Sequence, residues 1–135
     1  MIRYADTNEA TDFTFWWWRA AAALFLVTIF CLSHAPQGTI RSDLGTGLGD
    51  KVSHAFAYGL LTLLLLQATG RRGTVEASAT VLVLPIVVLI GSVDELTQPL
   101  FGRICSLADW MANLVGPCLA VFLQWATRRV WRSKR

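Results

Sequence analysis

The sequence is poor in charged residues for its length. Asp, Glu, Lys and Arg make up 16% of its 135 residues, whereas hydrophobic residues make up 54%. An ordinary soluble domain carries about 25% charged residues, and a soluble domain of this size could not bury so much apolar surface in one core. The composition excludes a disordered chain and a typical soluble enzyme, and it indicates an integral membrane protein.

Cysteine is also scarce. The chain has three cysteines, Cys31, Cys105 and Cys118, and no C-x-x-C pair. An odd number of cysteines without metal-ligand spacing indicates neither a disulfide-stapled secreted module nor a zinc site. Cys31 and Cys118 fall inside apolar stretches, where cysteine behaves as a small hydrophobic residue.

Four long apolar segments stand out, at residues 15–33, 52–69, 74–93 and 107–127. Each has close to the roughly 20 residues that a helix needs to cross a bilayer, and none alternates with the period of a barrel strand. The sequence therefore predicts an all-α integral membrane bundle of four transmembrane helices. Residues 1–14 form an N-terminal segment in this prediction, residues 15–127 the transmembrane domain and residues 128–135 a basic tail. The Gly-Arg-Arg-Gly turn at 70–73 predicts that the second and third helices form a hairpin.

The first apolar segment ends in Ser33-His34-Ala35, which resembles a signal-peptide cleavage site. A signal peptide begins with basic residues, however, and this segment follows an acidic stretch that contains Asp6, Glu9 and Asp12. We therefore expect a retained helix.

The distribution of basic residues predicts the orientation of the helices. Nine of the twelve Lys and Arg residues fall on the side shared by the two termini and the 70–73 turn: Arg3, Arg19, Arg71, Arg72, Arg128, Arg129, Arg132, Lys134 and Arg135. Three fall on the other side: Arg41, Lys51 and Arg103. Because cytoplasmic loops carry the excess of positive charge, both termini are predicted to be cytoplasmic. The basic tail is expected beside anionic membrane lipids, and without a recognition fold it does not indicate nucleic-acid binding.

Polar residues gather where three of the predicted helices meet the non-cytoplasmic surface. They are Asp50, Lys51, His54 and Tyr58 in the second helix, Asp94, Glu95 and Gln98 at the end of the third, Arg103 in the loop, and Asp109 and Asn113 in the fourth. Polar stripes facing lipid would be costly, so we expect them to face one another or a wet cavity. Gly116 lies on the same side of the fourth helix as Asp109 and Asn113, where it would let another helix approach closely.

The formal charges of this group do not balance. Four carboxylates face two cations, Lys51 and Arg103. Crowded like charges bind a proton or attract a cation, so the sequence predicts a shared proton, a protonated His54 or a bound divalent cation. The candidate metal ligands are His54, Asp94, Glu95 and Asp109. Lys51 with Arg103 would suit a phosphate. The alternative is that the same residues only join helices or anchor them at the interface.

The polar residues also follow an ordered set of motifs. These are Asp50-Lys51-x-x-His54-x-x-x-Tyr58, then Asp94-Glu95-x-x-Gln98, then Gly102-Arg103-x-x-Ser106-x-x-Asp109-x-x-x-Asn113-x-x-Gly116. The set resembles the VanZ-like family over about residues 50 to 120, although Phe101-Gly102 stands where a Pro-Gly pair is common. The resemblance implies a small multi-pass protein of the bacterial cytoplasmic membrane whose signature positions are the polar residues named above. The family takes its name from a protein linked to low-level resistance to teicoplanin, a glycopeptide that binds cell-wall precursors outside the membrane.

Two functions are compatible with these observations. One is a binding or modulating protein at the cell envelope, acting on a wall precursor, a lipid-linked glycan, a lipid headgroup or a glycopeptide antibiotic. The other is a membrane-embedded hydrolase or transferase that acts on a lipid-linked envelope substrate through the carboxylates, His54 and a divalent metal. A third reading, a small structural subunit of a larger membrane complex, would depend on the small residues around Gly116 more than on the charges.

Overall fold

The fold is a bundle of long helices, as predicted. A computed structural model describes residues 7–35, 48–69 and 77–132 of the chain. Its elements are α1 (Thr7–Ser33), α3 (Leu48–Thr69), α4 (Ala77–Thr97), the short 3-10 helix η1 (Gln98–Phe101) and α5 (Leu107–Arg132). Within those ranges four stretches are long and apolar enough to cross a membrane: Phe15–Ser33, Leu48–Thr69, Ala77–Phe101 and Leu107–Val130.

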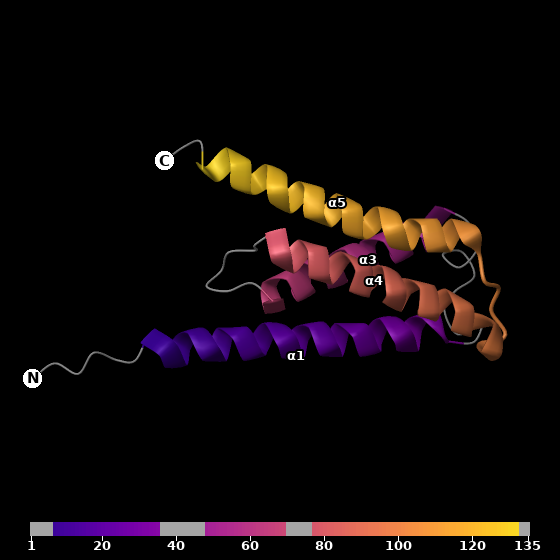
Figure 1. Cartoon of the computed structure of the whole chain (residues 1–135). Helices are drawn as coiled ribbons and strands as arrows, with labels where there is room; N and C mark the ends of the chain where they lie inside the picture. Colours follow the sequence, from indigo (N-terminus) through magenta and orange to yellow (C-terminus); the bar gives the residue numbers. More distant parts are fainter. Residues whose placement is uncertain (1–6, 36–47, 70–76, 133–135) are drawn as a thin grey trace, which may run out of the picture.

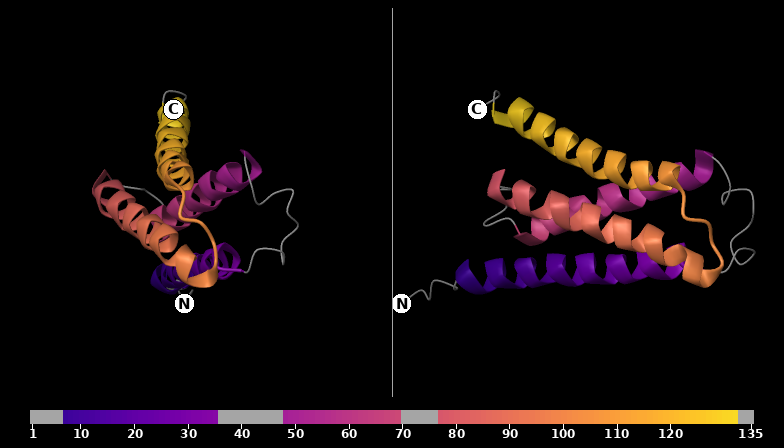
Figure 2. Two further views of the ribbon diagram at one scale, coloured as in Figure 1. Left: turned by 90° about the vertical axis from the view of Figure 1, so that its right-hand side faces the viewer. Right: turned by 45° about the vertical axis from the view of Figure 1, so that its right-hand side comes forward.

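Helix α3 lies at the centre of the bundle. It packs against α1, α4 and α5, and α4 also packs against α5. The helices converge at the end that holds the start of α3, the end of α4 and the start of α5 (Figure 1). From there α5 diverges from α1, so the start of α1 and the end of α5 lie apart at the opposite end of the bundle (Figure 2). The predicted turn at 70–73 lies outside the described residues.

Each of the four helices extends beyond the apolar segment that predicted it, and the extensions of α3 and α4 concern the predicted polar residues. Helix α3 begins at Leu48, which places Asp50 in its first turn, where a carboxylate interacts favourably with the helix dipole. Helix α4 continues past Val93 to Thr97, so Asp94 and Glu95 belong to its last turn and are buried. Both extensions carry polar side chains into the converged end of the bundle.

Apolar side chains face both inward and outward, as expected for a helix bundle in lipid. The core includes Leu61, Leu66 and Val87, each fully buried. Other large apolar side chains, such as Leu24 on α1 and Val81 on α4, are mostly exposed on the surface of the bundle. In water this outer surface would be unfavourable, whereas in a bilayer it contacts hydrocarbon. The exposed apolar surface thus agrees with the composition.

Close contact between α3 and α5 depends on glycine. A Cβ added at Gly116 would overlap the backbone of Ala55, and one added at Gly59 would lie 3.1 Å from the carbonyl oxygen of Gly116. Two helix backbones therefore touch without intervening side chains, the packing that small residues permit in membranes. The close approach that the sequence predicted at Gly116 is confirmed.

We predict that Gly116→Ala destabilises the bundle. The added methyl group must displace the Ala55 backbone, which places the cost at the upper end of the roughly 1–3 kcal/mol typical of overpacking. Thermal unfolding of the purified protein in detergent measures the effect. Val115→Ile adds one carbon at a neighbouring exposed position of α5 and serves as the matched control. Equal unfolding temperatures for the two variants would contradict the close contact.

Candidate functional site

The ten polar residues predicted from sequence come together at the converged end of the bundle. They form one connected group, here called the polar cluster: Asp50, Lys51, His54, Tyr58, Asp94, Glu95, Gln98, Arg103, Asp109 and Asn113, together with His34. Most of its members are buried, and Glu95 and Tyr58 are 1% exposed. A set of charged groups at this depth must be neutralised by partners.

Two of the carboxylates pair with the permanent cations. Lys51 Nζ lies 3.3 Å from Asp109 Oδ1, which joins α3 to α5. Arg103 Nη2 lies 3.7 Å from Asp50 Oδ1, which joins the loop before α5 to the start of α3. The Lys51 side chain is 37% exposed and that of Arg103 14%, so these pairs form the outer rim of the polar cluster.

Glu95 and Asp94 face histidines instead. His54 Nδ1 lies 2.9 Å from Asn113 Oδ1 and 3.5 Å from Glu95 Oε1. Because both oxygens are acceptors, the Nδ1–H group donates a hydrogen bond to Asn113 Oδ1. The other ring nitrogen, Nε2, lies 4.0 Å from Asp50 Oδ1. Gln98 donates to Glu95 Oε1 at 3.3 Å. Glu95 thus accepts hydrogen bonds from three segments of the chain: from Gln98 in η1, from the Ser106 backbone N–H in the loop and from the Asn113 amide in α5.

His34 faces Asp94 as His54 faces Glu95, and it is not among the site residues predicted from sequence. Its Nδ1 lies 2.9 Å from the Phe30 carbonyl and 3.5 Å from Asp94 Oδ1, and its Nε2 lies 2.8 Å from Thr97 Oγ1. The Thr97 hydroxyl donates to Val93, so both ring nitrogens face acceptors. The ring thus connects the end of α1 to the last turn of α4. Phe30 stacks on the ring, with centroids 4.0 Å apart.

Ser33 adds to the same connection between α1 and α4. Its hydroxyl donates to Asp94 Oδ1 at 2.6 Å, a short bond typical of a charged acceptor. The sequence prediction considered Ser33 and His34 only as parts of a tripeptide that resembles a cleavage site. The pattern that could have identified them is a polar Ser-His pair at the end of the first apolar segment, at the same membrane level as the other polar residues.

Two buried polar atoms in the polar cluster have no hydrogen-bond partner among the described residues. They are Tyr58 Oη and Asp94 Oδ2. Tyr58 is 1% exposed, and its hydroxyl faces the carboxylates of Asp94 and Glu95. The two atoms are a donor and an acceptor that face each other, so the Tyr58 hydroxyl can donate to the Asp94 carboxylate with a small movement of either side chain.

Three of the four candidate metal ligands converge there. His54, Asp94 and Glu95 each offer one donor atom, and these atoms lie within 4.8 Å of one another. Asp109 lies outside this group and binds Lys51 instead. One imidazole and two carboxylates form a mixed nitrogen and oxygen set that suits Zn²⁺ or Mn²⁺ better than the all-oxygen preference of Ca²⁺ or Mg²⁺.

The arrangement combines cations at its rim with acceptors at its base. It can hold a ligand that presents an anionic group to Lys51 and Arg103 and a hydrogen-bond donor or cation to Asp94 and Tyr58. No protein-family model, curated protein or solved structure matches the chain.

Proposed function

We propose that the chain is a VanZ-like protein of the bacterial cytoplasmic membrane that acts at the cell envelope. In this proposal both termini are cytoplasmic, and the polar cluster faces outward, where it binds or modulates a wall precursor, a lipid or a glycopeptide. The excess of basic residues on the side of the termini supports the orientation. The ordered motifs support the family, and the joining of their polar residues in one cluster supports a shared site.

The observation that carries the proposal is the convergence of His54, Asp94 and Glu95 at the base of a cluster that has Lys51 and Arg103 at its rim. Polar groups that only join helices pair with one another, as Trp110 of α5 and Ser92 of α4 do. One imidazole and two carboxylates within 4.8 Å of one another exceed what joining two helices requires, and such a buried group is typical of a position that receives a polar partner. A binding role therefore accounts for the cluster better than helix association alone.

We expect expression of the chain to raise the teicoplanin tolerance of a sensitive bacterium. His54→Ala and Glu95→Gln should abolish the protection at matched membrane abundance, because both remove bonds at the base of the polar cluster. The minimal inhibitory concentration is the measurement. Thr127→Val, an exposed change in the half of α5 away from the cluster, is the control and should retain protection. Protection that survives both cluster variants would contradict the assigned site.

A second candidate is a membrane-embedded hydrolase or transferase that uses a divalent metal on a lipid-linked envelope substrate. The convergence of His54, Asp94 and Glu95 favours it. These residues would hold the ion, which supplies Lewis-acid chemistry or an activated water in such enzymes. Lys51 and Arg103 would bind a phosphate of the substrate.

The two candidates differ in their metal requirement. If the second holds, the purified chain binds Zn²⁺ or Mn²⁺ with a stoichiometry near one, measured by elemental analysis after dialysis. Glu95→Gln and Asp94→Asn should each reduce the bound metal at least about tenfold, because each removes one ligand charge. Asp109→Asn makes the same carboxylate-to-amide change outside the ligand group and should retain the metal. If the protein binds no metal and still confers protection, the metal-dependent enzyme is excluded and only the binding role remains.

A further inference from the structure

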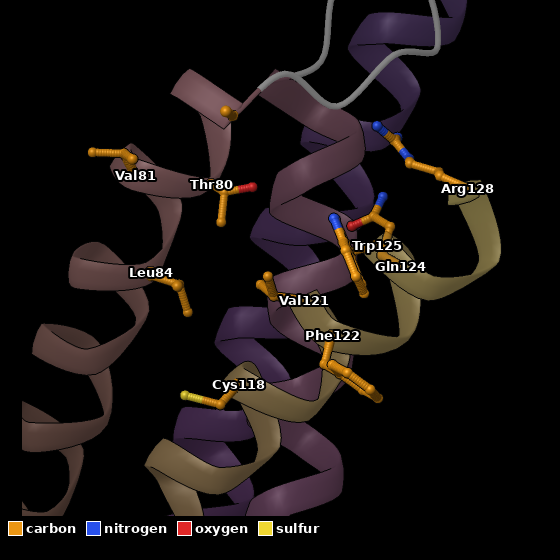
Figure 3. Close-up of a pocket in the computed structure, with 10 residues that line it drawn as sticks. Thr80, Val81, Leu84, Cys118, Val121, Phe122, Gln124, Trp125 and Arg128 are labelled. Carbon is orange, nitrogen blue, oxygen red and sulfur yellow. The ribbon is translucent and has the colours of Figure 1, made fainter. Parts of the chain in front are cut away.

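A cavity lies far from the polar cluster, between α4 and the C-terminal half of α5. Its volume is about 620 Å³. Leu84 of α4 faces Cys118 and Val121 of α5 across it, and Phe122 of α5 also lines it (Figure 3). This part of the wall is apolar and lies at membrane depth, because all four residues belong to the spans that can cross a bilayer. The proposed function uses none of them.

The cavity is graded in polarity along α5. Cys118 marks its apolar end, whereas Gln124, Trp125 and Arg128 line the other end (Figure 3). From Cys118 to Arg128 the helix rises about 15 Å at 1.5 Å per residue. That length is about half of the roughly 30 Å hydrocarbon core of a bilayer. The cavity therefore has the depth of one leaflet, with its polar end at the level of the headgroups.

The chemistry of the polar end matches an anionic headgroup. Arg128 brings a guanidinium, Gln124 an amide and Trp125 an indole N–H, and all three are hydrogen-bond donors. Tryptophan is typical of the membrane interface. Arg129 follows directly, with its guanidinium over the Trp125 ring at 5.3 Å, so the surroundings are also basic.

We propose that this cavity binds one anionic phospholipid of the cytoplasmic leaflet. An acyl chain would lie between Leu84 and Val121, and the phosphate would meet Arg128 and Gln124. Anionic lipids are attracted to basic residues at the cytoplasmic surface. The apolar part of the cavity, which has the depth of one leaflet, would hold an acyl chain of the same lipid. A second copy of the protein fits less well, because its own basic end would face this one in a parallel pair. The site is independent of the polar cluster, and the leaflet named here rests on the orientation proposed above.

The test compares lipid binding to the full-length protein by native mass spectrometry, with phosphatidylglycerol and phosphatidylcholine of the same chain length. We expect a preference of about fivefold for phosphatidylglycerol, the factor that one basic residue near anionic headgroups contributes. Arg128→Gln should remove the preference, and Leu84→Trp should reduce binding of both lipids because the indole fills the apolar end. Arg129→Gln removes the same charge from a residue that does not line the cavity, and it should retain most of the preference.

Three results would overturn the proposal. Equal binding of the two lipids to the wild type would show that the cavity does not select charge. Equal losses in Arg128→Gln and Arg129→Gln would assign the preference to the basic surface as a whole. A dimer mass that disappears in Leu84→Trp would assign the cavity to a second copy of the chain. Arg128→Gln keeps a polar, unbranched side chain at the rim and leaves the apolar packing unchanged, so a folding failure of Leu84→Trp leaves the test valid.

Discussion

Direct backbone contact between α3 and α5 sets the geometry on which the polar cluster depends. Ala55, whose backbone touches Gly116, follows His54 in sequence, and Gly116 lies three residues after Asn113. The contact therefore brings the His54 ring and the Asn113 amide into hydrogen-bond distance. Gly91 plays a similar part on α4, since a Cβ there would lie 3.1 Å from that of Asn113. Small residues next to large polar ones let three helices meet closely enough for their side chains to bond.

The second constraint is electrostatic. A bilayer offers no water to the buried carboxylates, so each must find a counter-charge or a donor within the protein. Arginine and lysine neutralise the two carboxylates at the rim. His34, directly after α1, and His54 of α3 meet the two adjacent acids at the end of α4. Consecutive residues of a helix point in directions about 100° apart, which explains how neighbours in sequence reach histidines from different segments of the chain.

Much of the architecture could be predicted from sequence, because membrane helices are encoded in local apolar runs. The ends of the helices were less accessible. Hydropathy falls at Asp94, so the apolar segment was expected to stop at Val93, but partners from other helices bury Asp94 and Glu95 and the helix continues to Thr97. His34 could not be selected by spacing, since its partner Asp94 is sixty residues away. The same reason explains why Asp109 was grouped with the metal candidates although it binds Lys51.

The central claim is that the polar cluster faces the outside of the cell, and labelling of Cys105 tests it most directly. Cys105 is exposed in the loop beside Arg103, and Cys31 and Cys118, exposed on helix surfaces, can be replaced by alanine. A membrane-impermeant maleimide should label Cys105 in intact cells, whereas a cysteine introduced at Thr127 should react only after the membrane is opened. If Cys105 is protected until the cells are permeabilised, and Thr127→Cys is labelled from outside, the cluster faces the cytoplasm and a role on the outer surface is excluded.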